Sequence, residues 1–149
     1  MVQLKNYLII ISFALLTLSI PIPNSSASES KTPSEIAKIS NQITVKLEGV
    51  QGGSGVLINR KGNTYTVLTA WHCVSDLRKG DELEINTSDG KWHIIDQGSI
   101  KRIPNVDLAV FTFSSGNSYK IASTGSIKDV EMGNSIFVSG FPLPSPSVP

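Results

Sequence analysis

The sequence predicts an all-β fold, a small closed antiparallel barrel preceded by one short helix. Three observations support this prediction. Six short segments alternate between apolar and polar residues or are rich in β-branched and aromatic residues, and turn-forming residues separate them. Helix-start signals occur at one place, near residue 33. The chain has 149 residues, 40% hydrophobic and 17% charged, which is ordinary for a single globular domain.

The first 27 residues are expected to be a secretory signal peptide rather than part of the fold. Lys5 supplies a basic start, residues 8–20 are an apolar run of 13, and Ser25 and Ala27 are small residues at the cleavage-determining positions. The alternative is a retained membrane anchor, but a hydrocarbon core needs about 20 apolar residues. We therefore expect cleavage after Ala27 and export to the periplasm or the extracellular space.

The charge balance excludes two classes of partner. Lys5 is the one charged residue among the first 27, so the cleaved chain keeps 12 basic and 12 acidic side chains and has no net charge. Neither a nucleic acid nor an anionic membrane surface is favoured by that balance. We expect no nucleic-acid partner, and no membrane association after signal cleavage.

One short helix is expected at the start of the domain. Residues 24–31 form a Ser-rich linker, after which Thr32, Pro33 and Glu35 supply an N-cap, a proline at the first helical position and the glutamate of a capping box. The helix is expected to end near Ile39.

Six strands are predicted after this helix. In the first, Ile43, Val45 and Leu47 point to one side and polar residues to the other, as in a half-buried strand. The fourth and fifth flank Asp89-Gly90, a strong signal for a β-hairpin. The predicted strands are residues 42–48, 53–58, 64–70, 83–86, 91–97 and 106–113.

A seventh strand-like run covers residues 135–140, after a loop over residues 114–134. Four of the eight residues 142–149 are proline, which cannot donate to a sheet ladder. The sheet is therefore expected to stop there.

Three motifs occur in a characteristic order: GGSGVLIN at 52–59, VLTAWHC at 67–73 and NVDLAVFTF at 105–113. Together they resemble the first half of a trypsin-like, chymotrypsin-fold serine endopeptidase of the bacterial exported type. The resemblance covers about residues 42–142 and implies a six-stranded antiparallel β-barrel, the first of a double-barrel fold. With the signal peptide and helix described above, the resemblance gives this organisation: signal peptide 1–27, linker and short helix 28–41, first barrel 42–134, and the start of a truncated second barrel at 135–149.

In this family the histidine of T-A-x-H is the general base, and the aspartate that opens the D-L-A-V strand orients it. The resemblance assigns these roles to His72 and Asp107, which are 35 positions apart. A neutral imidazole can take a proton from a hydroxyl, and a carboxylate on its other nitrogen fixes the tautomer. Without the resemblance, His72 is better explained as an ordinary strand-end histidine and Asp107 as a strand-capping acid. With both motifs in the family's order, the catalytic roles are the better explanation.

No nucleophile accompanies this pair. The family's serine lies in a G-x-S-G-G loop of the second barrel, and none of the 42 residues after Asp107 forms that motif. Ser54 lies in a first-barrel strand and Ser139 in the seventh predicted strand, so neither is a credible nucleophile. We expect a truncated serine endopeptidase for peptide or protein substrates, inactive as written because it lacks the serine and the oxyanion hole. The alternative is a non-catalytic pseudo-protease barrel that binds a peptide or a protein.

Two neighbours of His72 depart from the better-known family members. Trp71 stands where the animal enzymes have a small residue, so the packing behind His72 is expected to differ. Cys73 is the only cysteine, which leaves a buried thiol, an intermolecular bridge or a coincidence of position. By resemblance it matches a cysteine that in many trypsins pairs with one in the preceding glycine-rich strand.

No cofactor or metal ion is expected. His72 and His93 are 21 positions apart and belong to no Cys/His cluster, so a zinc site is disfavoured, and His93 is expected to be an exposed strand residue. Asp81, Glu82 and Glu84 lack the ligand spacing of a calcium loop and are expected to form a solvated turn and strand edge.

Overall fold

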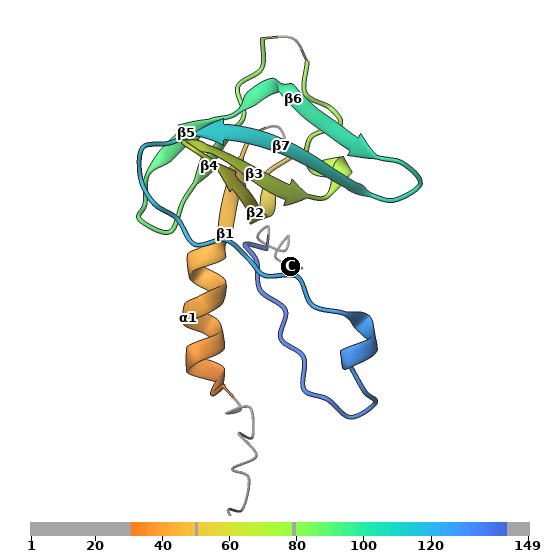
Figure 1. The fold of residues 1–149 in the computed structure, drawn as a ribbon. Helices are drawn as coiled ribbons and strands as arrows, with labels where there is room; N and C mark the ends of the chain where they lie inside the picture. Colours follow the sequence, from red (N-terminus) through yellow and green to blue (C-terminus); the bar gives the residue numbers. More distant parts are fainter. Residues whose placement is uncertain (1–30, 50, 79, 143–149) are drawn as a thin grey trace, which may run out of the picture. The chain divides into compact units, whose positions relative to one another are not determined.

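The computed structural model describes residues 31–49, 51–78 and 80–142, and in this part the fold is one helix and a single antiparallel sheet (Figure 1). The order of its seven strands is β5-β4-β1-β2-β3-β7-β6. The predicted all-β class and antiparallel pairing are confirmed. The elements are α1 Pro33–Ile43, β1 Thr44–Glu48, β2 Gly53–Lys61, β3 Thr64–Thr69, β4 Glu84–Asn86, β5 Trp92–Ile94, β6 Asp96–Ile103 and β7 Leu108–Ser114.

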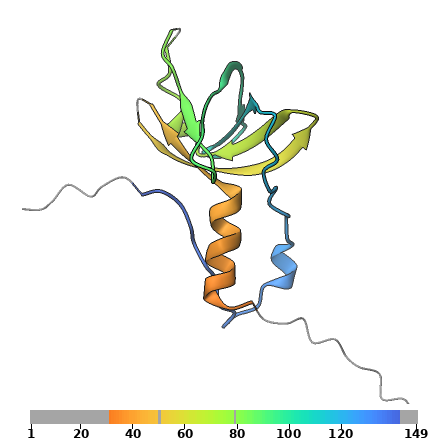
Figure 2. The same ribbon diagram turned by 90° about the vertical axis from the view of Figure 1, so that its left-hand side faces the viewer.

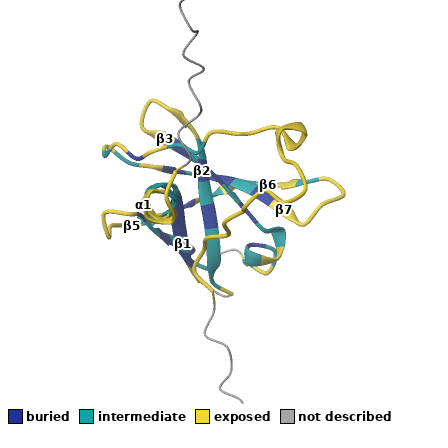
Figure 3. Ribbon diagram, turned by 90° about the horizontal axis from the view of Figure 1, so that it is seen from below, coloured by how far each residue is buried: buried dark blue, intermediate teal, exposed yellow. Residues whose placement is uncertain are grey.

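The core lies on one face of this sheet, and the sheet curls around it. Figure 3 shows the buried stretches on the strands. Ile85 of β4 and Phe111 of β7 belong to the same buried cluster although three strands separate β4 from β7 in the sheet. Each fully buried large side chain of this kind stabilises the fold by about 1.5 to 3 kcal/mol. The largest are Tyr65, Phe111, Phe113, Leu47, Leu57, Leu83 and Ile85.

The helix begins as predicted and ends later. Thr32 Oγ1 accepts a hydrogen bond from the Glu35 N–H at 3.3 Å, and the Glu35 carboxylate accepts one from the Thr32 N–H at 2.8 Å, which completes the capping box. α1 then continues past Ile39 to Ile43, because no glycine or proline interrupts it and the Thr44 N–H still donates to the Ser40 carbonyl. β1 therefore starts at Thr44 rather than at residue 42.

The predicted strand at 91–97 is in fact two strands. β5 ends at Ile94, the Ile95 N–H donates to the Leu83 carbonyl at 3.1 Å, and the chain then enters β6. Asp96 pairs with Thr112 of β7, and this hairpin runs on to Ile103. A bulge after Asp96 shifts the register, so this strand does not show a regular alternation of apolar and polar residues in the sequence. The sheet consequently has seven strands where six were predicted.

His93 is half-buried, so its predicted exposure is wrong. In β5 it is His93 that faces inward, while its apolar neighbours Trp92 and Ile94 are exposed. The His93 ring packs 5.0 Å from the Phe113 ring, centre to centre. Burial lowers the pKa of His93, with Asp89 opposing and Lys91 adding to this change. Pairing with β4 decides which face of a three-residue strand is inside, and composition does not.

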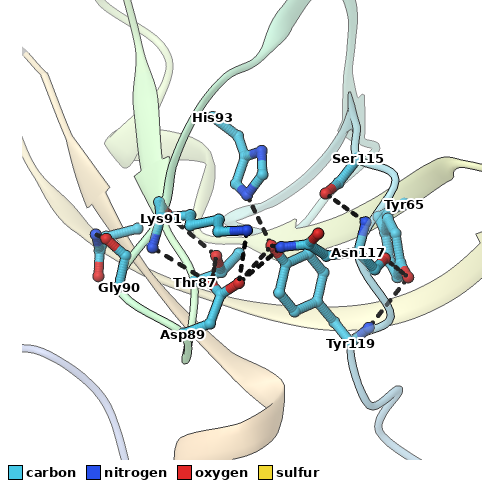
Figure 4. A network of polar contacts seen from close by, with 10 residues as sticks. Tyr65, Thr87, Asp89, Gly90, Lys91, His93, Ser115, Asn117 and Tyr119 are labelled. Atoms are coloured by element: carbon cyan, nitrogen blue, oxygen red, sulfur yellow. Dashed lines mark hydrogen bonds and ion pairs between the residues drawn. The ribbon is translucent and has the colours of Figure 1, made fainter.

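A polar network joins the β4–β5 turn to the segment after β7 (Figure 4). Asp89 Oδ2 accepts hydrogen bonds from Asn117 Nδ2 at 2.8 Å and from the Tyr119 hydroxyl at 3.2 Å. Because the Tyr119 proton goes to Asp89, its oxygen accepts from His93 Nε2 at 2.9 Å. The Tyr65 hydroxyl extends the network to β3 by donating to the Asn117 carbonyl at 2.8 Å. These bonds tie one end of the curled sheet to the chain that leaves β7.

Asp89 is the ionised centre of this network. Desolvation, the largest single contribution, raises its pKa, but hydrogen bonds from Thr87, Lys91, Asn117 and Tyr119 outweigh it and lower the pKa to about 2 from 3.8. Ionised Asp89 therefore stabilises the folded state more than protonated Asp89 does.

We expect Asp89→Asn to lower the Tm by about 3 to 6 °C at pH 7, since hydrogen bonds to a carboxylate are stronger than those to an amide. Because the folded-state pKa, about 2, lies below 3.8, this contribution is present above about pH 4 and is lost as the pH falls toward 2. The difference in Tm between the two proteins should therefore shrink over that range, as measured by circular dichroism. Asp129→Asn, at an exposed aspartate of the turn Ile127–Asp129, is the control. A difference that stays constant from pH 7 to pH 2 would contradict the assignment.

The predicted strand at 135–140 is not formed. Residues 123–142 are exposed and contain no strand, and Figures 1 and 2 show this segment leaving the sheet on the side from which α1 extends. A strand needs a neighbouring strand for its backbone groups, and no strand of the described residues pairs with this segment, although the Phe141 N–H donates to Ser54 Oγ at 2.6 Å. Several apolar side chains along it are exposed, namely Ile127, Val130, Met132, Ile136, Phe137, Val138 and Phe141.

The predicted signal peptide, residues 1–27, and residues 143–149 of the predicted second-barrel start lie outside the described residues. Over the ranges that the structure does describe, every helix is too short or too polar to cross a bilayer.

Candidate active site

His72 lies in a tight turn that directly follows a central strand. β3 ends at Thr69, Ala70 keeps an extended backbone, and residues Trp71–Cys73 form a single 3-10 turn, η1. The apolar alternation of β3 buries Tyr65, Val67 and Thr69, so the chain emerges from the core just before the histidine. The His72 side chain is 64% exposed.

Asp107 closes the turn between β6 and β7. β6 ends at Ile103, and Asn105 takes a left-handed conformation with φ 64°, which asparagine tolerates better than most residues. Asp107 is the last residue of this turn, immediately before Leu108 begins β7. The predicted strand start at residue 106 is thus two residues early.

Strand register brings the two residues together. β3 and β7 are antiparallel neighbours, with Thr69 opposite Ala109. Because antiparallel strands run in opposite directions, the residues that follow Thr69 meet those that precede Ala109. The Trp71 N–H donates to the Asp107 carbonyl at 3.2 Å and extends the ladder to the site. Two positions 35 apart in the sequence therefore become neighbours.

The Asp107 carboxylate contacts His72 through both of its oxygens. Oδ2 lies 2.6 Å from Nδ1 of the ring, and Oδ1 accepts the His72 backbone N–H at 3.0 Å. Both bonds lower the pKa of Asp107, and the bond to the ring contributes most. An ionised carboxylate can only accept, so Nδ1 carries the proton, and in a neutral imidazole Nε2 then has the lone pair. This is the tautomer that a general base requires.

Among the described residues, no hydroxyl group is hydrogen-bonded to the His72 ring. Ser75, the nearest serine in sequence, donates from Oγ to the His72 carbonyl at 3.4 Å and not to the imidazole. Ser54 Oγ is bonded to the backbone of Phe141, and Ser139 lies in a pocket of about 230 Å³ between α1 and the exposed segment. Neither Ser54 nor Ser139 is hydrogen-bonded to His72 in the part of the chain described.

Cys73 packs against the glycine-rich strand, as its place in the motif suggests. It is half-buried beside the core, and a Cβ added at Gly53 of β2 would fall 2.7 Å from its Sγ. The thiol thus occupies space that a side chain at position 53 would need. Of the alternatives left open by the sequence, this geometry is that of a partly buried, packed thiol.

One neighbour of the site was not found from the sequence. Arg102 of β6 stacks on Trp71, its guanidinium carbon 5.3 Å from the ring centre. Nothing in the local pattern around position 102 indicates this, because the partner lies on another element. Among the described residues, no three His, Cys, Asp or Glu side chains gather closely enough to hold a metal ion.

A protein-family model described as a trypsin-like peptidase domain matches residues 53–148, more than half of the chain. The matched range includes β2 to β7 and therefore both His72 and Asp107. No curated protein is similar enough in sequence to count as a relative.

Proposed function

Because the chain belongs to the trypsin-like peptidase domain family, we propose that it is the first-barrel part of an exported serine endopeptidase. In this proposal residues 42–134 form the barrel, His72 is the general base and Asp107 orients it. Residues 1–27 direct export, to the periplasm or the extracellular space. The family implies peptide or protein substrates.

The observation that carries this proposal is the two-point contact between the Asp107 carboxylate and His72, at 2.6 and 3.0 Å. With Nδ1 protonated, Nε2 can take the proton of a serine hydroxyl as its oxygen attacks the scissile carbonyl. The positive charge that forms on the imidazole is stabilised by Asp107. The same nitrogen then returns the proton to the departing amine.

Two parts of the reaction are missing from these 149 residues. The attack needs a serine, and the tetrahedral intermediate needs backbone N–H groups around its oxyanion. The family supplies both from a second barrel. We therefore propose that residues 135–149 lead into such a barrel and that the chain by itself does not hydrolyse peptide bonds. The more than half-exposed dyad, 64% for His72 and 58% for Asp107, fits a face that another part of the enzyme covers.

Fusion of a second barrel from a full-length relative after Pro142 should produce peptide hydrolysis that the 149-residue chain lacks. The physical reason is that the base and its orienting acid are already in place, so only the nucleophile and the oxyanion hole have to be added. The measurements are turnover of a fluorogenic peptide and covalent labelling by a serine-directed phosphonate.

The matched control is the same fusion with its second-barrel serine replaced by alanine, which should fold and bind but neither turn over nor be labelled. A fusion that melts cooperatively and binds peptide but shows neither turnover nor labelling would overturn the proposal. The chain would then be a non-catalytic barrel that binds a peptide or a protein.

A further inference from the structure

Trp71 and Arg102 make a second contact between the two elements that carry the dyad. Trp71 opens η1 and lies half-buried against the core. Arg102 is an exposed residue of β6, and its guanidinium carbon lies 5.3 Å from the centre of the Trp71 ring. A guanidinium within about 6 Å of an aromatic ring is attracted by it, and its planar shape allows stacking.

This contact lies next to the turn that holds Asp107. Arg102 pairs with Ala109 across the β6–β7 hairpin, and Asp107 is in the turn of that hairpin. On the other side, Trp71 immediately precedes His72 and donates its backbone N–H to the Asp107 carbonyl at 3.2 Å. The pair of Trp71 and Arg102 therefore joins the same two segments that His72 and Asp107 join.

The dyad side chains receive little restraint from packing of their own. Both are more than half exposed, at 64% and 58%. The His72 ring is hydrogen-bonded to Asp107, and the nearby Ser75 hydroxyl donates to the His72 carbonyl rather than to the ring. The relative position of Nδ1 and the carboxylate thus depends on how η1 is held against the β6–β7 hairpin.

Resting on the function proposed above, we propose that Arg102 and Trp71 are positioning residues for the dyad. The stack of guanidinium on indole holds η1 against the hairpin and keeps Nδ1 of His72 within hydrogen-bonding distance of Asp107. Neither residue touches the reacting atoms. Their effect is transmitted through the turn that carries His72 and the turn that carries Asp107.

Arg102 also carries a charge, and substitutions separate its charge from its stacking. Arg102→Lys keeps the positive charge and loses the planar group, whereas Arg102→Met loses both and keeps an apolar stem. Trp71→Leu removes the ring and leaves the arginine. Lys101→Met, at the exposed neighbour on β6, removes a charge of the same sign and serves as the matched control.

The test is made by NMR on the full 149-residue chain, with two readouts. One is the downfield proton of His72 Nδ1–H, and the other is the pKa of Asp107 from its carboxyl carbon. The hydrogen bond from the His72 ring is the largest cause of the lowered pKa of Asp107. Loosening the dyad should therefore raise that pKa toward its ordinary value. We expect this rise, with weakening or loss of the Nδ1 proton signal, in Arg102→Met and Trp71→Leu, and a smaller change in Arg102→Lys.

The double variant with both Arg102→Met and Trp71→Leu should change the NMR readouts no more than the single variant with the larger effect, because the two residues act as one unit. If Arg102 acts through its charge alone, the NMR readouts of Arg102→Lys and Trp71→Leu will equal those of the unaltered chain, and loss of a nearby charge in Lys101→Met will change them. That result overturns the proposal. Unchanged readouts in both Arg102 variants overturn it as well. Since Arg102 is exposed, these variants decide the question even if Trp71→Leu fails to fold.

Catalysis gives an independent reading in the two-barrel fusion. There Arg102→Met should lower kcat by up to about 100-fold with KM little changed, as expected when a reacting group is slightly misplaced. A fusion that melts cooperatively and binds peptide but is inactive with Arg102 in place refutes the proposed function, while the NMR result still decides the positioning role. An active fusion whose kcat and dyad signals ignore Arg102→Met refutes only the positioning role.

Discussion

His72→Ala in the two-barrel fusion should lower kcat by about 10⁶-fold, the size of loss seen when a triad member that works with its nucleophile is removed. The physical reason is that the serine hydroxyl loses the only group positioned to take its proton. Turnover of a peptide substrate, compared with phosphonate labelling of the serine, measures the effect. Because the Nε2 lone pair and the serine act together, both signals should fall.

His93→Gln is the matched control, since it replaces the other histidine of the chain. His93 is hydrogen-bonded to Tyr119 in the network of Figure 4 and is not part of the His72–Asp107 dyad. We expect this variant to lower the Tm and to leave kcat within a few-fold of the unaltered fusion. If His72→Ala retains kcat within about tenfold, His72 is not the general base.

Asp107→Asn should lower kcat in the same fusion by up to about 10⁴-fold. An asparagine side chain can donate its amide N–H toward Nδ1, which favours the tautomer with the proton on Nε2 and removes the lone pair that the reaction needs. The backbone bond from the His72 N–H to the side-chain oxygen can be kept, so the turn should remain folded. Steady-state kinetics and a thermal melt of the same sample separate the two effects.

The control for this change is Asp129→Asn, an exposed aspartate outside the dyad. It should leave both kcat and Tm nearly unchanged. Because the pKa of Asp107 is lowered, its carboxylate should stay ionised down to pH values below its ordinary range, so the loss in Asp107→Asn should persist across neutral pH. A loss that appears only as a lower Tm would assign Asp107 a structural role instead.

Several features of the fold follow from local physical chemistry, and the sequence predicts them well. The capping box of Thr32 and Glu35 depends on residues three positions apart, and the structure contains it. The Asp89-Gly90 turn between β4 and β5 depends on one glycine, whose φ is 77°. The family resemblance of the motifs implied that Asp107 orients His72, and their side chains lie 2.6 Å apart, while their catalytic roles remain proposals.

Other features depend on partners that no local pattern contains. The strand predicted at 135–140 has suitable residues, but no neighbouring strand accepts its backbone bonds within the described residues. The strand β5 exposes its apolar residues and buries His93, because pairing with β4 chooses the face. The division between β5 and β6 at Ile95 arises because one strand edge changes partner from β4 to β7.

The sequence by itself determined the places of most strands, where the helix and the hairpin turn begin, and which two residues belong to the family's motifs. All of these depend on side chains within a few positions of one another, whose backbone preferences and alternation act locally. Only the tertiary structure decided that Thr69 stands opposite Ala109, which brings His72 to Asp107, and that Arg102 reaches Trp71. Register and packing between distant strands depend on the whole buried face of the sheet, so no short stretch of sequence specifies them.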